Sequence, residues 1–273
     1  MNKRAILAVV RKDLKVVTQS KSVMIPLIIV PVIMLVLLPG LVALVPLLDA
    51  QFGASEMQDM QAFLANMPPS LQAAIANFNL NQQMVYLLLI YFFAPMYLIV
   101  PMMVASVIAA DSFAGEKERK TLEALLYTPT TDFELVAAKL VAAWVPAIIV
   151  AWVGFVLYGI VANGAAWGTM GQIFFPNTMW VVLALWVAPG VAGLGLSATV
   201  LVSVRANSFQ DAYQVGAMVV LPLVILMISQ AVGVIYFSAG FVFLLGLGCW
   251  IIDAGLLWLS VKLFQRSEII ARL

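Results

Sequence analysis

The segment DSFAGEKERKTLEALLYTPTTDFELVAAK, residues 111–139, decides how this chain is organised. It is polar and carries charges of both signs, whereas residues 84–110 before it and 140–163 after it contain no charged residue. A hydrocarbon layer about 30 Å thick needs roughly 20 apolar residues per helix. The two flanks therefore predict membrane spans, and the segment between them is expected to lie in water.

Within this segment, residues 114–126 are predicted to form a short amphipathic helix at the membrane face. Glu116 and Lys120 are spaced to pair across one helical turn. Three leucines recur at helical spacing and make one apolar stripe: Leu122, Leu125 and Leu126. Such a stripe needs a cover, which is either the protein's own spans and lipid, or a groove on a soluble partner.

The composition identifies an all-α integral membrane protein. Of 273 residues, 64% are hydrophobic and only 10% are charged, whereas soluble domains have about a quarter of their residues charged. The net charge of +1 argues against a nucleic-acid partner. The chain has no histidine, a single cysteine and no GxxxxGK[ST] loop, so we expect no catalytic site, no metal site and no ATP site of its own.

Hydropathy divides the chain into an interfacial helix and a six-span domain, residues 1–22 and 23–273. The N-terminal helix has a basic face and an apolar face, which is typical of a helix lying on a membrane. Asp13 falls inside the apolar arc, so we predict a basic partner from another segment; the alternative is that the helix tilts and Asp13 reaches water. The predicted spans are residues 23–48, 84–110, 136–162, 178–202, 213–231 and 241–264.

The basic residues predict the orientation of these spans. All 14 lysines and arginines fall in segments 1–22, 111–139, 203–212 and 262–273, which lie on one side of a six-span topology. The positive-inside rule then places both termini and the 114–126 helix in the cytoplasm. On the opposite side, residues 229–240 predict either a tight turn or a short re-entrant hairpin. Aromatic residues around segment 164–177 are expected to form an interfacial belt: Trp167, Phe174, Phe175 and Trp180.

Residues 116–129 carry a resemblance to a known family. Glu116-Lys117-Glu118-Arg119, then Thr121-Leu122-Glu123-x-Leu125-Leu126-x-Thr128-Pro129, with Lys139 at the next span, resembles the cytoplasmic loop of type-2 ATP-binding-cassette (ABC-2) exporter permeases. The usual form of that loop is close to E-K/R-E-x-G-T-L-E-x-L-L-x-T-P. Lys120 stands where the family commonly has glycine. Residues 208–214 and 262–270 are similar to the family's polar turn before span five and to its C-terminal end.

The resemblance implies a permease that forms a central pathway as a homo- or heterodimer in the prokaryotic plasma membrane, in contact with membrane lipids. Two separate ATP-binding subunits would dock beneath it and hold the ATP and Mg. Residues 1–22 would be the family's elbow helix. The loop helix would be the coupling helix, whose docking positions would be Glu116, Glu118, Arg119, Thr121, Leu122, Glu123, Leu125 and Leu126.

Two further groups of residues admit a functional and a structural interpretation. Asp253 lies near the middle of the last predicted span, where burying a carboxylate is costly, so it is either a cation or proton site or a hydrogen-bonding group between helices. Four residues of span two either line an apolar substrate route or simply pack: Met96, Tyr97, Met102 and Met103. The alternatives to a permease are a stand-alone ion-coupled carrier or channel that uses Asp253, and an assembly protein without transport.

Overall fold

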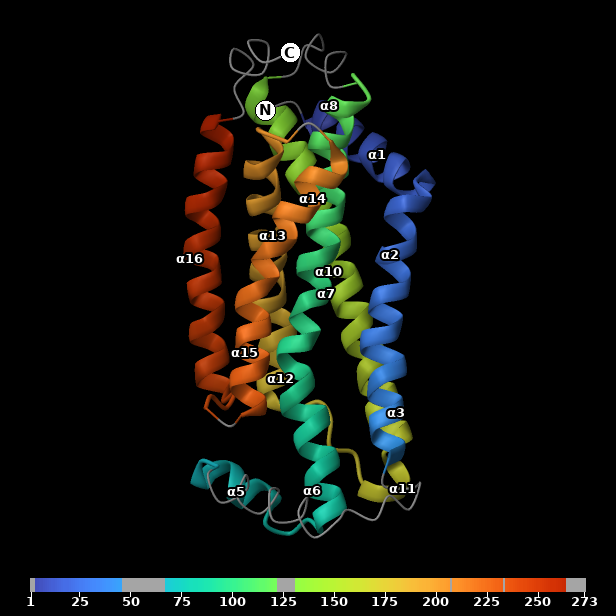
Figure 1. The fold of residues 1–273 in the computed structure, drawn as a ribbon, viewed down its shortest axis with the longest axis vertical. Coiled ribbons are helices and arrows are strands. Elements are labelled where there is room, and N and C mark those ends of the chain that lie inside the picture. The colour runs from blue at the N-terminus through green and yellow to red at the C-terminus, as the bar shows by residue number, and fades with distance from the viewer. Residues whose placement is uncertain (1–2, 46–66, 122–130, 207, 233, 264–273) are drawn as a thin grey trace.

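The computed structural model describes residues 3–45, 67–121, 131–206, 208–232 and 234–263. Within these ranges the chain forms helices and short connections and has no strand, and its long helices stand side by side in a bundle (Figure 1). Six helices in the described ranges are long and apolar enough to cross a membrane. The predicted all-α fold with six apolar spans is therefore confirmed.

The bounds of the helices follow the order of the chain. Helix α1 (Lys3–Gln19) precedes span one, which consists of α2 (Lys21–Val32), η1 (Ile33–Leu37) and α3 (Leu38–Leu44). A short helix, α5 (Pro69–Ile75), precedes span two, which consists of α6 (Leu80–Tyr86), η3 (Leu87–Phe92), α7 (Phe93–Ala110), η4 (Asp111–Gly115) and α8 (Glu116–Glu118). Span three is α10 (Asp132–Ala165), followed by α11 (Trp167–Met170). Span four consists of α12 (Thr178–Val182), η5 (Leu183–Val187) and α13 (Ala188–Ser203). Span five consists of α14 (Phe209–Ala217), η6 (Met218–Val220) and α15 (Leu221–Ala231), and span six is α16 (Ala239–Leu263).

Spans two and three begin about four residues earlier than hydropathy predicts, because polar caps start their helices. Asn79 accepts a hydrogen bond from the Gln82 backbone N–H at 2.9 Å, and the Gln82 side chain accepts one from the Asn79 N–H at 3.0 Å. Thr131 and Glu134 form the same reciprocal box at the start of α10. Each box satisfies backbone donors that a helix leaves open at its first turn. Span two also continues beyond its predicted end at residue 110, through η4 into α8. The prediction of a separate helix over residues 114–126 is therefore wrong in its described part, because residues 114–118 belong to span two and the helix ends at Glu118. Residues 122–126 of that prediction lie outside the described ranges.

The centre of the bundle is the contact between α7 and α13, on which α10 and α16 also pack. Gly195 allows this close approach, because a Cβ at that position would lie 2.6 Å from the backbone oxygen of Met102. Gly193 does the same for α16, since its Cβ would overlap the carboxylate of Asp253. Small residues at helix contacts are typical of membrane bundles, where close packing replaces the hydrophobic effect between helices.

An aromatic cluster fills the half of the bundle away from α1. Trp180 is fully buried, stacks on Tyr158 with ring centroids 4.7 Å apart, and meets Phe175 edge-on. Its indole N–H donates to the Ile90 carbonyl at 2.7 Å. Ile90 lies in the π-helical segment η3, five residues before Pro95, and Pro95 has no N–H that could bond to this carbonyl. The prediction that Phe175 and Trp180 belong to an interfacial belt is therefore wrong, because both lie in the core.

Spans five and six are joined by a plain turn rather than a re-entrant hairpin. Helix α15 ends at Ala231, and the N–H of Val234 bonds back to the carbonyl of Ser229 at 2.8 Å. The hydroxyl of Ser238 accepts a hydrogen bond from the Phe241 N–H at 3.2 Å and so caps the start of α16. Residue 233, within the turn, lies outside the described ranges.

Candidate functional site at the charged end of the bundle

The end of span two, the start of span three, helix α1 and the turn before α14 lie at one end of the bundle (Figure 1). Helix α1 packs along α10, and η4 and α8 contact each other there. The described residues of the polar segment 111–139 are at this end, among them Glu118, Arg119 and Thr121, which are predicted to face a soluble partner. The opposite end carries α5, α6 and α11.

Four charged side chains from three elements form an ion cluster at this end, made of Lys12, Asp13, Glu116 and Lys139. The Lys139 ammonium lies 2.6 Å from one carboxylate oxygen of Glu116 and 3.7 Å from Asp13, and it donates to the Ser112 carbonyl at 2.6 Å. Lys12 pairs with the other oxygen of Glu116 and lies 3.0 Å from Asp13. Two carboxylates therefore face two ammonium groups, and the cluster is electrically balanced.

Burial makes this ion cluster costly in desolvation free energy unless its charges are paired. Asp13, Glu116 and Lys139 are at most 3% exposed, and the Lys139 ammonium also lies 5.4 Å from the centre of the Phe113 ring. A charge removed from water is costly unless it is paired and hydrogen-bonded, so each member depends on the others. The cluster thereby fastens α1 to the end of span two and the start of span three.

The ion cluster settles the prediction made for Asp13. Its basic partner from another segment is Lys139, with Lys12 adding a second, so that prediction is confirmed and the alternative of a water-exposed carboxylate is wrong. The predicted pairing of Glu116 with Lys120 is also wrong, because Glu116 turns inward to Lys12 and Lys139. Periodicity on a single helix could not reveal this, because the partners come from elements far apart in the sequence.

Lys12 stays charged at physiological pH. Burial lowers the pKa of its ammonium, but the hydrogen bond and the negative charge of Glu116, together with Asp13, outweigh that effect and raise the pKa above 10.5. A group whose pKa is raised on folding stabilises the fold below its unfolded pKa and loses that contribution as the pH rises through the folded value. The contribution of Lys12 is therefore complete at neutral pH and decreases only above about pH 10.5.

The next two charged residues tie α8 to the turn between spans four and five. The ammonium of Lys117 donates to the Ala206 carbonyl at 3.2 Å. The carboxylate of Glu118 accepts a hydrogen bond from the Phe209 N–H at 2.9 Å, at the first turn of α14. A carboxylate at a helix N-terminus is stabilised by the unpaired N–H groups and the helix dipole. The polar turn before span five is thus bonded to the end of span two.

Lys120 closes the end of span two in a backbone conformation that favours glycine. Its φ is +57°, in the left-handed region. The Thr121 N–H bonds to the Glu116 carbonyl at 2.9 Å and the Lys120 N–H bonds to the Lys117 carbonyl at 3.1 Å. This pair of bonds is the Schellman helix end, in which the residue after the cap is left-handed and is usually glycine. Lys120 is also the position at which the family loop that residues 116–129 resemble commonly has glycine.

We expect Lys120→Gly to stabilise the protein by about 1 kcal/mol, because glycine adopts the left-handed conformation without the cost imposed by a Cβ. The measurement is the midpoint of thermal unfolding of the purified protein. Lys120→Ala is the matched control, since it removes the same charge but keeps the Cβ. Equal midpoints for the glycine and alanine variants would contradict the prediction.

The predicted docking residues divide into buried, exposed and undescribed groups. Glu116 is 3% exposed and held by the ion cluster, so its carboxylate does not lie at the surface. Glu118, Arg119 and Thr121 are exposed, and Arg119 bonds to the carboxylate of Asp111 at 2.9 Å. Four positions lie outside the described residues: Leu122, Glu123, Leu125 and Leu126.

Asp253 lies between spans four and six. It is 3% exposed and accepts a hydrogen bond from the Ser197 hydroxyl, which matches the structural interpretation made from the sequence. It also borders a cavity of about 170 Å³ that is lined by Trp144 and Trp250 among other residues. The hydrogen bond gives the carboxylate a partner on a neighbouring span.

We expect Asp253→Asn to leave any transport activity and expression unchanged, because the asparagine side-chain oxygen can still accept the bond from Ser197. Asp253→Leu places a larger side chain where the Asp253 carboxylate already packs tightly against Gly193, so it is expected to destabilise the protein by about 1–3 kcal/mol. Transport in vesicles and thermal unfolding measure the two effects. A folded Asp253→Asn variant that no longer transports would instead support the ion-site interpretation.

The four residues considered for a substrate route pack within the bundle of one chain. Tyr97 is fully buried and its hydroxyl donates to the Ala151 carbonyl at 3.0 Å. Met102 is 3% exposed. Met96 and Met103 are half-buried and pack against the same core.

The comparisons with known proteins bear on the whole chain. A family model described as ABC-2 family transporter protein matches residues 7–266. This match confirms the resemblance that residues 116–129 carry. Comparison with curated proteins and with solved structures gave no match.

Proposed function

Because the chain belongs to the ABC-2 transporter family, we propose that it is the membrane-spanning permease subunit of an ATP-driven exporter. The six apolar spans supply a membrane domain, and the sequence has no P-loop that could bind ATP. ATP and Mg would then be held by two separate ATP-binding subunits. Two copies of the permease, or this chain and a related one, would enclose the pathway.

The ion cluster is the observation that supports the mechanical part of this proposal, in which movement of an ATP-binding subunit is transmitted to the spans. Closure of an ATP-binding subunit must reach the spans through a stiff connection, because a flexible one would absorb the displacement. Glu116 and Lys139 join spans two and three directly at their charged ends, and Lys12 and Asp13 add α1. A push on the loop between the two spans would move these three elements together as a rigid body.

The docking surface would consist of the loop after α8 and the exposed residues that lead into it. Leu122, Leu125 and Leu126 would enter a groove on the ATP-binding subunit, and Glu118 and Arg119 would lie at the rim. Rim charges set orientation and association rate more than affinity. Glu116 is left out of this surface because it is buried.

The orientation we propose places the charged end in the cytoplasm of a prokaryotic cell. Helix α1 would then be the elbow helix, with its exposed basic residues towards anionic lipid head groups. The turn between spans five and six and helix α5 would face the other side. This orientation follows from the positive-inside rule applied to the 14 lysines and arginines.

The proposal is tested by co-expressing the chain with its ATP-binding subunit and reconstituting the purified complex in liposomes. We expect a stable complex whose ATPase activity and transport both require the permease. A chain that transports in liposomes without ATP or a partner would support the carrier alternative and contradict the proposal. Cysteine labelling of positions 118 and 121 in intact cells tests the orientation, and we expect protection from impermeant reagents.

A further inference from the structure

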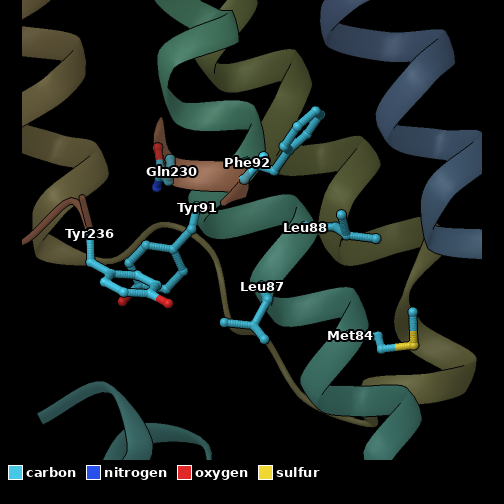
Figure 2. A pocket seen from close by; sticks show the side chains of 8 residues that line it. Met84, Leu87, Leu88, Tyr91, Phe92, Gln230 and Tyr236 are labelled. Carbon is cyan, nitrogen blue, oxygen red and sulfur yellow. The ribbon is translucent and has the colours of Figure 1, made fainter. Parts of the chain in front are cut away.

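A cavity of about 290 Å³ lies near the end of the bundle where span two begins and α15 ends, opposite the ion cluster (Figure 1), and Figure 2 shows the residues that line it. One wall is the first part of span two, where Leu87, Leu88 and Tyr91 border it. The other wall is the end of span five and the following turn, where Gln230 and Tyr236 border it. The cavity therefore lies between two spans that belong to different parts of the chain.

Gln230 is the unusual residue of this cavity. It is 3% exposed, and neither its side-chain nitrogen nor its side-chain oxygen has a hydrogen-bond partner among the described residues. Buried polar side chains in folded proteins are nearly always paired. Leaving such a group unpaired costs about 1–3 kcal/mol, so its retention at this place needs an occupant that bonds to it.

The remaining lining determines the chemical class of that occupant. No charged residue is among the described residues that border the cavity, and its walls are mostly aliphatic and aromatic side chains. A charged ligand would have no counter-ion here and would be costly to bury. The amide of Gln230 offers donors and an acceptor together, so its complement carries an acceptor and a donor on neighbouring atoms.

We propose that this cavity binds an uncharged amphipathic molecule, whose amide or hydroxyl group bonds to Gln230 and whose apolar body lies against Leu87, Leu88 and Tyr91. Small-molecule sites have this composition, with an apolar surface and a few polar groups that set orientation. The assignment of such a molecule as a transported substrate rests on the proposed function. The binding itself does not depend on the proposed function.

Water alone is a poor occupant of this cavity. A buried water is held by roughly two to four polar partners, and apolar cavities stay dry. Here Gln230 could anchor one or two waters, whereas the aliphatic wall would anchor none. An amphipathic molecule satisfies the amide and the apolar wall together.

The test uses the full chain alone in lipid nanodiscs and a photoreactive probe, octanamide carrying a diazirine on its alkyl chain. We expect saturable labelling of residues 84–92 and 230–236, located by mass spectrometry. Unlabelled octanamide should compete at least about tenfold better than nonane, which has a similar size but no polar group. Labelling elsewhere, or equal competition by nonane, would show that the cavity holds only lipid or water and would overturn the proposal.

A substitution at Gln230 gives an independent signature. Gln230→Met keeps the size but removes the unpaired amide, so we expect a higher unfolding midpoint without ligand and a loss of specific octanamide competition. Gln210→Met is the matched control, because Gln210 is exposed in the same span, and it should change neither. Unchanged competition in Gln230→Met would show that the amide does not recognise the ligand.

The same probe separates this inference from the proposed function. The nanodisc measurement needs no ATP-binding subunit, so its failure rejects the binding site whatever the chain does in a complex. Octanamide should also change the ATPase rate of the reconstituted complex. Binding without that change would leave the site established and would contradict its assignment to the transport pathway.

Discussion

Lys139→Met is expected to destabilise the protein by about 3–5 kcal/mol, which is one of the two largest effects we predict. Breaking a buried ion pair from one side leaves an uncompensated charge, and the penalty is much larger than the net contribution of the intact pair. Here Asp13 and Glu116 would remain buried with Lys12, which is partly exposed, as the remaining cation of the ion cluster. Thermal or denaturant unfolding of the purified protein measures the loss.

The control for this variant is Lys15→Met, on the exposed side of the same α1 helix. Surface substitutions of this kind usually change stability by less than about 0.5 kcal/mol. Equal losses in the two variants would contradict the importance of the ion cluster.

The double variant Lys139→Met with Glu116→Leu tests the electrostatic cause. It removes one charge of each sign and leaves Lys12 beside Asp13, which is a balanced pair. We expect it to be more stable than Lys139→Met alone, because balanced hydrophobic replacement of buried ions is often neutral. Without such recovery, the loss would come from the packing of Lys139 on Phe113 instead.

Leu125→Asp is expected to abolish assembly with the ATP-binding subunit, which is the largest functional effect we predict. In the proposed complex, Leu125 would be buried at the centre of the docking groove, where residues contribute most to binding. A carboxylate placed there without a partner costs several kcal/mol, so affinity should fall by more than about 100-fold. Co-purification and the ATPase rate of the reconstituted complex measure the effect.

Two controls separate docking from folding in this experiment. Leu125→Met conserves volume and polarity and should retain the complex, whereas Glu118→Gln changes a rim charge and should mainly slow association. The Leu125→Asp chain should keep the unfolding midpoint of the wild type. A Leu125→Asp protein that still assembles would contradict the proposed docking surface.

The six spans could be predicted from hydropathy because a membrane requires long, uncharged runs, and this requirement is local in sequence. Capping boxes were also local signals: Asn79 with Gln82 and Thr131 with Glu134 stand at the required spacing, and they explain why two spans begin early. The family could be inferred because residues 116–129 form a continuous motif. In each case the information lies within one short, continuous stretch of sequence.

Tertiary structure decided the features that depend on which helices meet. The need of Asp13 for a cation followed from its place on an apolar face, but the identity of Lys139 as that cation depends on α1 packing along α10. The position of Trp180 also depends on packing, because an aromatic residue is compatible with a membrane interface as well as with a core. The lack of hydrogen-bond partners at Gln230 likewise depends on how the surrounding helices are placed. Hydropathy and motif spacing follow from the order of residues along the chain. The pairing of buried charges and amides instead depends on contacts between segments more than a hundred residues apart, and those contacts are set by packing.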